Sequence, residues 1–376
     1  MTKRITTLFT LITIILLPFI LNAQNNSKED KQLREKIAQM LIIGFRGMEL
    51  SPKSEIYGLI AKEKIGGVIL FDYDVPSKKP KRNIENPDQL RALCSELQKL
   101  GNNQLFISID QEGGKVSRLK EKYGFPPSVS QQFLGDNNNP KLTKEWASRS
   151  ARNLKSLGIN LNFTPSVDVN INPDCPIIGK LERSFSSDPE MVVKHAKIVI
   201  EEHNKLGITT TVKHFPGHGS SKSDTHKGIA DITSTYDAQE LVPFKELIEE
   251  GLVDVVMTSH VFNANFDSLY PSTMSYKTLT NMLKVEMGFK GIIVSDDMAM
   301  GAIAKQYDLE TCLEKAINAG VDMFIFSNNG DNYDKEIGYK AIETIFKLVK
   351  QGKVDERKIS NSYAKILKLK TDKGLQ

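Results

Sequence analysis

Short apolar runs alternate with helical segments along most of the chain. Eight runs have the length and the β-branched content of buried strands. They lie at residues 41–45, 68–71, 105–109, 159–163, 208–212, 253–257, 292–294 and 323–326. Between them apolar residues recur at helical spacing, as at Trp146, Ala147, Ala151, Leu154 and Leu157. Buried strands that alternate with helices predict a parallel sheet covered by helices.

Glycine stands between a helical segment and the next apolar run at Gly158, Gly207, Gly251, Gly291 and Gly320. Such a residue suits a helix that turns back sharply into a parallel strand, because glycine tolerates positive φ. We therefore predict an α/β fold over residues 24–376, a single (β/α)8 TIM-type barrel with C-terminal helices. A doubly wound open sheet would show the same alternation. No G-x-G-x-x-G follows the first run, which disfavours that alternative.

Two stretches lack periodic apolar residues and predict long loops, residues 74–87 and residues 123–140. Asp237-x-x-Glu240 is an N-cap signature ahead of the helix that ends near Glu250.

The first 23 residues have the pattern of a secretory signal. Lys3 and Arg4 precede an apolar run from Leu8 to Leu21, and Ala23 is a small residue suited to cleavage. The run is broken by Pro18 and is short for a membrane span. We expect a signal peptide at residues 1–23, export to the periplasm or the medium, and no stable membrane insertion after cleavage.

Charge and cysteine content exclude several classes. The formal net charge of +4 is too small to indicate a nucleic-acid partner. Cys94, Cys175 and Cys312 are widely spaced and include no C-x-x-C pair, so neither a disulfide framework nor a zinc site is indicated. We expect a monomer without a metal or a cofactor.

Polar residues collect where the predicted strands end. Asp110 follows the third run, Lys213-His214 the fifth and His260 the sixth, and Ser295-Asp296-Asp297 directly follow the seventh. The active site of a barrel lies at this end of its strands. One aspartate of the pair could cap the next helix while the other faces the centre.

The loop after the fifth run holds Asp224 and His226. A carboxylate beside an imidazole can fix its tautomer and raise its pKa, which suits general acid/base chemistry. Together with Asp296 the pair fits a two-step displacement at a sugar carbon, with a carboxylate nucleophile and a separate proton donor. The plain alternative is a surface turn built from Ser, Asp and Gly.

A metal site is the competing chemistry, because His214, His218, Asp224 and His226 are all possible ligands. Metal-dependent hydrolase barrels usually also place H-x-H after the first strand, and Gly44-Phe45-Arg46 has no such motif.

Four motifs together resemble glycoside hydrolase family 3, and within it the bacterial β-N-acetylglucosaminidases. They are I-D-Q-E-G-G at 109–114, R-S-F at 183–185, K-H-F-P-G-H-G at 213–219 with D-T-H at 224–226, and S-D-D-M at 295–298. The resemblance extends from about Leu33 to Leu367. The chain departs from the common pattern at Thr225, where Ser is frequent, and at Met298-Ala299. It also departs in its predicted signal peptide, because well-known cell-wall-recycling members act in the cytoplasm.

The resemblance implies a retaining exo-β-N-acetylglucosaminidase that removes terminal β-linked N-acetylglucosamine from an oligosaccharide. It implies that Asp296 is the nucleophile and that His226, paired with Asp224, is the acid/base. It also implies that the hydroxyls and the N-acetyl group of the terminal sugar are held by Asp110, Arg118, Arg183, Lys213 and His214. Arg118 could instead be a surface charge.

Three alternatives stay open at this point. Phosphate could replace water in the second step, because a neutral histidine repels an anionic acceptor less than a carboxylate does. The N-acetyl group could act as nucleophile with Asp110-Gln111-Glu112 as the acidic pair, although this leaves Asp224, His226 and Asp296 without roles. The chain could also be a sugar-binding barrel without activity.

Overall fold

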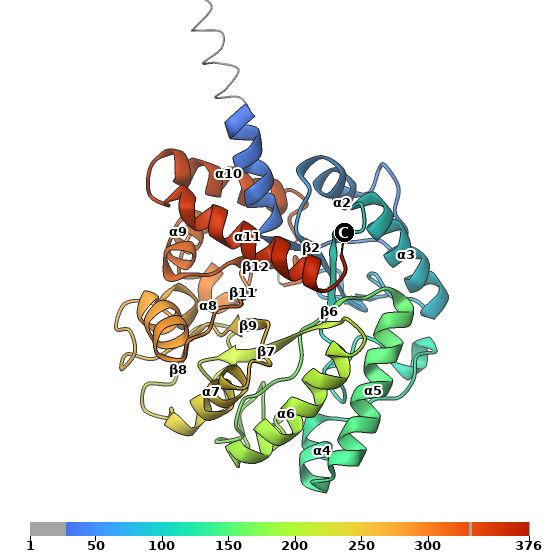
Figure 1. Cartoon of the computed structure of the whole chain (residues 1–376), viewed down its shortest axis with the longest axis vertical. Coiled ribbons are helices and arrows are strands. Elements are labelled where there is room, and N and C mark those ends of the chain that lie inside the picture. The colour runs from blue at the N-terminus through green and yellow to red at the C-terminus, as the bar shows by residue number, and fades with distance from the viewer. Residues whose placement is uncertain (1–27, 331–332, 376) are drawn as a thin grey trace, which may run out of the picture.

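The computed structural model describes residues 28–330 and 333–375. Eight parallel strands close into a barrel in the order β1-β12-β11-β9-β7-β6-β5-β2 (Figure 1). The strands are β1 (Leu41–Gly44), β2 (Gly67–Leu70), β5 (Phe106–Ile109), β6 (Leu161–Asn162), β7 (Thr209–Phe215), β9 (Val255–Thr258), β11 (Ile292–Asp297) and β12 (Met323–Phe326). Each coincides with one of the eight apolar runs, so the predicted barrel is confirmed.

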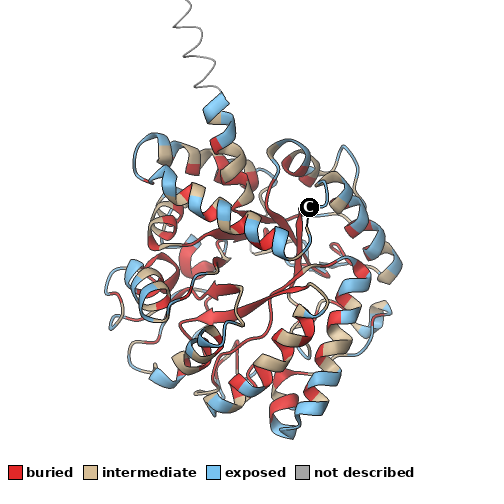
Figure 2. Cartoon of the chain, viewed as in Figure 1, coloured by how far each residue is buried: buried red, intermediate tan, exposed pale blue. Residues whose placement is uncertain are grey.

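The helices surround the barrel. Residues 28–39 are helical. The α-helices that follow are α2 (Glu55–Gly58), α3 (Pro87–Leu100), α4 (Gln131–Asn137), α5 (Pro140–Leu157), α6 (Pro189–Asn204), α7 (Val242–Glu249), α8 (Gly301–Ala304), α9 (Leu309–Ala319), α10 (Ile337–Lys350) and α11 (Glu356–Asp372). Two π-helical segments, η1 (Leu59–Glu63) and η5 (Lys277–Glu286), lie between β1 and β2 and between β9 and β11, where they follow the first and sixth strands of the barrel. Figure 2 shows buried residues on the strands and the inner helix faces, with exposed residues outside.

Helix α5 illustrates how the sequence specifies these elements. Asn139 caps its start by accepting hydrogen bonds from the backbone N–H of Lys141 and Leu142. Its buried stripe includes Ala147, Ala151, Leu154 and Leu157, at the spacing of one helix face. Gly158 ends the helix in the left-handed region, with φ of 81°.

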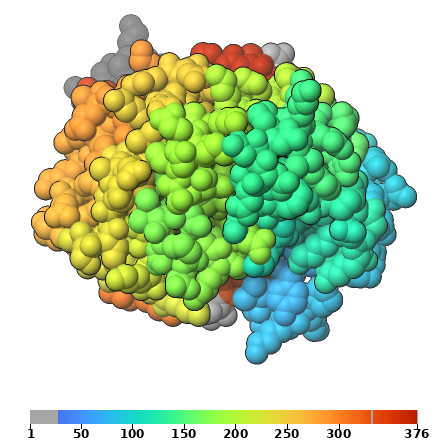
Figure 3. Space-filling model, turned by 90° about the horizontal axis from the view of Figure 1, so that it is seen from below, coloured from blue at the N-terminus to red at the C-terminus, as the bar shows by residue number. Residues whose placement is uncertain are grey.

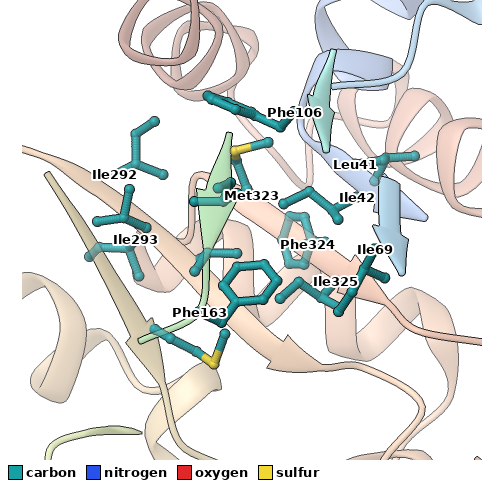
Figure 4. Close-up of a cluster of buried hydrophobic side chains, with 14 of the residues drawn as sticks. Leu41, Ile42, Ile69, Phe106, Phe163, Ile292, Ile293, Met323, Phe324 and Ile325 are labelled. Carbon is teal, nitrogen blue, oxygen red and sulfur yellow. The ribbon is translucent and has the colours of Figure 1, made fainter. Parts of the chain in front are cut away.

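Side chains from opposite strands fill the barrel. Phe163 follows β6 and Ile325 belongs to β12, and Figure 4 shows them close together among Ile69, Met323 and Phe324. All five are buried. The barrel is therefore a packed core whose interior is filled by layers of side chains.

Helix α11 closes the amino end of the barrel and crosses in front of the strands in Figure 1. Lys365 donates to the carbonyl of Gly291, just before β11, at 3.1 Å. Lys370 donates to the carbonyl of Gly66 at 2.9 Å and to Oε1 of Gln39 at 2.7 Å. Burial lowers the pKa of Lys370 to about 7. The opposite, carboxyl end of the barrel stays open for a site.

Three local predictions need correction. Residues 74–87 were predicted as a loop, but they take part in a short antiparallel hairpin, β3 (Tyr73–Asp74) with β4 (Lys79–Pro80). Residues 123–140 contain α4, which Ser130 caps through its side chain. Four of the five glycines before strands have positive φ, but Gly291 does not. A Cβ there would lie 2.3 Å from the carbonyl oxygen of Asp254, so Gly291 serves a close approach.

The predicted capping box is also wrong in one half. Asp237 caps the short 3-10 helix η3 (Ala238–Leu241) by accepting from the N–H of Gln239. The side chain of Glu240 instead accepts from the backbone N–H of Gly219 at 2.7 Å. The tertiary contact of Glu240 with Gly219 thus replaces the local cap. Gly219 lies at the beginning of the loop that carries Asp224 and His226.

The predicted signal peptide, residues 1–23, lies outside the described residues. Within the described ranges, no helix is long and apolar enough to cross a membrane. Cys94, Cys175 and Cys312 are free and buried.

The junction of β1 with β12 gives a test of the packing. A Cβ on Gly44 would lie 1.8 Å from the backbone oxygen of Ser327. We expect Gly44→Ala to lower the free energy of unfolding by about 1–3 kcal/mol or more, because the β12 exit must shift. Gly228→Ala is the control, since nothing lies within 4 Å of its Cβ position. Urea unfolding of both variants measures the difference, and equal stabilities would contradict the close approach.

Candidate functional site

A cleft of about 980 Å³ opens at the carboxyl end of the barrel. Its apolar floor includes Ile69, Phe163, Met257 and Ile325. These side chains come from β2, the end of β6, β9 and β12, which are alternate strands of the barrel. They correspond to one interior layer of a barrel of this type.

Charged side chains from the remaining strands also line the cleft. Asp110 follows β5, Lys213 belongs to β7, and Asp296 belongs to β11. The barrel thus brings together residues that are far apart in the sequence, as the strand-end prediction required.

The cations and carboxylates form a continuous chain of ion pairs. Arg118 contacts Asp110 with Nη2 to Oδ2 at 3.3 Å, and Lys213 Nζ lies 3.0 Å from Asp110 Oδ1. Lys213 Nζ also lies 2.6 Å from Glu112 Oε1. Arg183 binds Glu112 with two parallel hydrogen bonds of 2.8 and 2.7 Å. Four of the predicted sugar-binding residues, Asp110, Arg118, Arg183 and Lys213, therefore belong to this chain of ion pairs. Arg118 is not a free surface charge.

The pairing determines the charge state of the two acids. Burial alone would raise their pKa values, but Lys213 and Arg118 hold the pKa of Asp110 below its usual value. Burial is likewise outweighed at Glu112, where Arg183 and Lys213 lower the pKa. Both acids are therefore ionised at neutral pH.

His214 extends the chain. Its Nε2 lies 3.0 Å from Nη2 of Arg183, which donates, so this nitrogen accepts. Its Nδ1 therefore carries the proton and donates to Oδ2 of Asp168 at 2.7 Å. Asp168 is fully buried and also accepts from the N–H groups of His214 and His218. Asp168 thus fixes the tautomer and the position of His214.

The two aspartates of β11 have different surroundings. Asp297 accepts from the N–H of Ala299 at 3.1 Å and from the N–H of Ser327 at 3.0 Å, and the hydroxyl of Ser327 also donates to it. It thereby holds the turn after β11. The expected helix cap is not formed, because the N-cap residue of α8 is Met300 and no side chain caps this helix. Asp296 accepts only from the N–H of Asp297, at 2.8 Å, among the hydrogen bonds recorded for the described residues.

Their pKa values shift in opposite directions. Burial raises the pKa of Asp297. Burial also acts on Asp296, but the neighbouring imidazoles of His260 and His214 outweigh it and hold the pKa of Asp296 below its usual value. Asp296 is therefore the carboxylate available at the cleft wall.

His260, the polar residue expected at the end of the sixth strand, supports this turn. It is buried, with Nε2 3.0 Å from the backbone oxygen of Asp297 and Nδ1 2.8 Å from the hydroxyl of Thr273. Because a carbonyl can only accept, Nε2 carries a proton.

The predicted Asp224–His226 pair is present. Asp224 Oδ1 lies 2.8 Å from His226 Nδ1 and accepts from the backbone N–H of His226 at 2.9 Å. The side chains come together because the backbone turns at residues 225–227. Despite partial burial, these hydrogen bonds from His226 hold the pKa of Asp224 below its usual value. The imidazole is 63 % exposed and lines the same cleft as Asp296.

Backbone contacts hold the loop of Asp224 and His226 against α8. The N–H of Ala302 donates to the carbonyl of Thr225 at 3.0 Å, and the N–H of Gly301 to that of His226 at 3.3 Å. A Cβ on Gly301 would lie 2.7 Å from the His226 oxygen. The contact joins the loop after β7 to the segment that follows Asp296.

Glu240 anchors the beginning of the same loop. It is fully buried and accepts from the N–H groups of Gly219 and Ser220 at 2.7 and 3.4 Å. Its Oε1 has no partner among the described residues. Burial raises the pKa of Glu240 to about 7.

The alternative metal ligands are separated by other contacts. His214 is held by Asp168 and Arg183, and His218 Nε2 lies 3.3 Å from the hydroxyl of Thr225. Among the residues described, no group of three or more His, Cys, Asp or Glu side chains is placed to hold a metal ion.

Sequence reasoning missed three contributors. Glu112 was considered only as part of an acidic pair, Asp168 was assigned no role, and Glu240 was assigned to a cap. The i, i+2 spacing of Asp110 and Glu112 at a strand end was the available signal for Glu112. No local pattern indicated the other two, because their partners are distant in the sequence.

The chain was compared with known protein families. The family model described as the glycosyl hydrolase family 3 N-terminal domain matches residues 32–369. The chain belongs to glycoside hydrolase family 3. The resemblance in its motifs is thereby confirmed, and the Asp224–His226 and Asp296 positions lie within the matched family 3 domain.

The family 3 chain is 33 % identical over 341 residues to β-hexosaminidase A of Pseudoalteromonas piscicida, covering 84 % of this chain and 55 % of that protein. It is 34 % identical over 292 residues to a β-hexosaminidase of Tolumonas auensis, with 77 % and 83 % covered. A solved family 3 β-N-acetylglucosaminidase from Paenibacillus sp. str. FPU-7 superposes with a TM-score of 0.82 at 32 % identity, with 91 % and 62 % covered. The chain therefore spans little more than half of the Pseudoalteromonas and Paenibacillus proteins.

Because the ion pairs are buried and connected, we expect the loss of one charge to lower the free energy of unfolding strongly. We expect Glu112→Gln to lower the free energy of unfolding at pH 7 by about 3 kcal/mol, because Lys213 and Arg183 lose their shared buried partner. Glu182→Gln is the matched control, because Glu182 pairs with Lys115 at the surface and is 39 % exposed. Its change should stay below about 1 kcal/mol. Urea unfolding compares the two, and equal effects would show that the buried pairing adds no stability.

Glu240 predicts a pH-dependent effect on stability. Its folded pKa of about 7 lies above the ordinary 4.5, so its stabilising contribution is complete below pH 4.5 and is lost as the pH rises through 7. Glu240→Gln does not titrate. Its free energy of unfolding relative to the natural protein should therefore rise by up to roughly 3 kcal/mol between pH 5 and pH 8.

Urea unfolding across this pH range measures the difference. The control is Glu249→Gln, a change at an exposed position on α7, which should show a flat difference. A flat difference for Glu240→Gln as well would mean that the carboxyl group ionises normally in the fold.

Proposed function

We propose that the chain is a retaining exo-β-N-acetylglucosaminidase that hydrolyses terminal β-linked N-acetylglucosamine. One observation carries the proposal: an ionised carboxylate, Asp296, lines the same cleft as a carboxylate-paired imidazole, His226. Membership of family 3 and the β-hexosaminidase relatives support this substrate class.

In the first step Asp296 attacks the anomeric carbon while His226 protonates the leaving oxygen. Asp224 holds Nδ1 of His226, so the proton that moves is on Nε2. In the second step His226 removes a proton from water, which displaces Asp296 and gives overall retention. The imidazole of His226 is 63 % exposed and lines the cleft, which supports a role in proton exchange with a bound substrate.

The ion-pair chain would hold the terminal sugar. Asp110, Glu112 and Arg183 supply acceptors and donors for hydroxyl and amide groups, and Lys213 lies between the two acids. Because these charges are already paired, they are fixed in position before the sugar binds.

The N-acetyl group as nucleophile is less well supported. That mechanism needs an acidic pair free to polarise the amide. Asp110 and Glu112 are instead occupied by Lys213, Arg118 and Arg183.

Export to the periplasm or the medium also remains our proposal, and it rests on the sequence of residues 1–23 alone. A monomer also remains our proposal.

The test is release of nitrophenol from the β-N-acetylglucosaminide and from the β-glucoside. We expect activity on the N-acetyl substrate, a loss of roughly a thousandfold or more in Asp296→Ala, and a loss of about 100- to 10,000-fold in His226→Ala. Lys227→Ala, at an exposed position beside His226, is the control and should retain activity. Circular dichroism confirms that each variant is folded.

Adding phosphate to the assay tests whether water or phosphate accepts the sugar in the second step. If phosphate stimulates turnover and a sugar phosphate forms, the chain is a phosphorylase with the same first step. Full activity of Asp296→Ala would remove the carboxylate nucleophile from the mechanism.

A further inference from the structure

The cleft is larger than one sugar needs. Pockets of about 300–1,000 Å³ hold drug-sized ligands, and this cleft lies near the upper end at about 980 Å³. The charged layer around Asp110 and Lys213 lines only its inner part. The outer wall includes the segment between β2 and α3 that was predicted as a loop.

This segment stands out from the molecule. In Figure 3 the light-blue part of the chain between β2 and α3 protrudes at the lower edge, away from the red C-terminal segment at the upper edge. Helix α11 closes the amino end of the barrel, and the hairpin β3–β4 lies on the opposite side. It follows the carboxyl end of β2 directly and therefore lies beside the cleft mouth.

Two apolar side chains of the hairpin face water in the cleft. Tyr73 is 41 % exposed and Val75 is 45 % exposed. They are the only exposed large apolar side chains within residues 28–330 and 333–375 that line the cleft. Exposed apolar side chains at the wall of a ligand-sized cleft point to contact with a ligand.

The hairpin is held rigidly. Asp74 accepts two hydrogen bonds from Arg46, at 2.7 and 3.0 Å, and one from Arg82 at 3.1 Å. Asn329 fastens it to the exit of β12, because its amide donates to the carbonyl of Tyr73 at 3.0 Å and accepts from the N–H of Val75 at 2.9 Å. Burial acts against ionisation of Asp74, but Arg46 and Ser77 hold its pKa below the usual value. A surface fixed in advance loses little conformational entropy on binding.

We infer that Tyr73 and Val75 form the binding site for a second sugar ring, on the leaving-group side of the scissile bond. This inference rests on the proposed exo-hydrolase function, in which the terminal sugar occupies the inner cleft and the aglycone occupies its mouth. A pyranose ring has an apolar face of C–H groups that packs on an aromatic ring, and its hydroxyls remain in water. The site therefore selects β-N-acetylhexosaminides whose aglycone is itself a sugar.

The test compares a substrate that reaches the hairpin with one that does not. The first is the β-1,4-linked N-acetylglucosamine disaccharide, and the second is N-acetylglucosaminyl β-fluoride, whose leaving atom is too small to reach Tyr73. In Tyr73→Ala we expect kcat/KM for the disaccharide to fall about tenfold, with the loss confined to that substrate. Tyr73→Phe keeps the ring and should keep the disaccharide activity.

Tyr276→Ala is the matched control, because Tyr276 is 53 % exposed and does not line the cleft. It should alter neither substrate. Equal losses on both substrates in Tyr73→Ala, or no loss on either, would overturn the second sugar site.

A binding measurement on an inactive variant tests the second sugar site independently of the proposed activity. Titration calorimetry of Asp296→Ala should show tighter binding of the disaccharide than of N-acetylglucosamine, and the additional change Tyr73→Ala should abolish that advantage. If the natural chain cleaves nothing but this advantage depends on Tyr73, the catalytic proposal fails and the sugar site stands. If the disaccharide has no advantage in Asp296→Ala, the sugar site fails.

Discussion

The site depends on buried charges that neutralise one another. Arg118, Asp110, Lys213, Glu112 and Arg183 follow in alternating sign, each within ion-pair distance of the next. An isolated charge at this depth would be too costly, because burial removes its hydration. The protein can therefore present these carboxylates and cations to the cleft only as a connected set.

The surroundings of the two aspartates at the end of β11 also determine how each carboxyl group is used. Asp297 uses its oxygens on Ala299 and Ser327, which fixes the turn. Asp296 is left with few hydrogen bonds and with imidazoles nearby that favour its charge. Adjacent residues of the same type thus acquire different tasks from their surroundings. Glu240 and Asp168 support the other half of the site, since both accept backbone N–H groups at the start of the loop that carries Asp224 and His226.

The two outer elements of the cleft differ in how they are held. The loop of Asp224 and His226 meets α8 through backbone hydrogen bonds, and Lys305 at the end of α8 also donates to the carbonyl of Lys227 at 3.4 Å. The imidazole of His226 remains exposed. The hairpin with Tyr73 is held by buried Asp74 and Arg82 and by Asn329. The exposed imidazole therefore lies on a loop held mainly through its backbone, whereas the hairpin is held by buried side chains.

The sequence by itself determined the barrel, the strand ends and the Asp224–His226 pair. Apolar runs, helix caps and residues two apart are local patterns, and the repetition of the β/α unit leaves few topologies to consider. It also indicated that the polar residues after β5, β7 and β11 would meet, because parallel strands end at one side of a barrel.

Only the tertiary structure decided which of these residues pair. Glu112 and Arg183 are separated by 71 positions, and Asp168 and His214 by 46, so no local pattern connects them. Glu240 has the spacing of a capping residue yet bonds to Gly219, because a buried carboxylate gains more from two otherwise unpaired N–H groups than from a solvent-exposed cap. The hairpin of Tyr73 was hidden for a related reason, because its polar, lysine-rich sequence is typical of a loop. Its order comes from Arg46 and Asn329, which follow β1 and β12, and from Arg82, which lies two residues after β4.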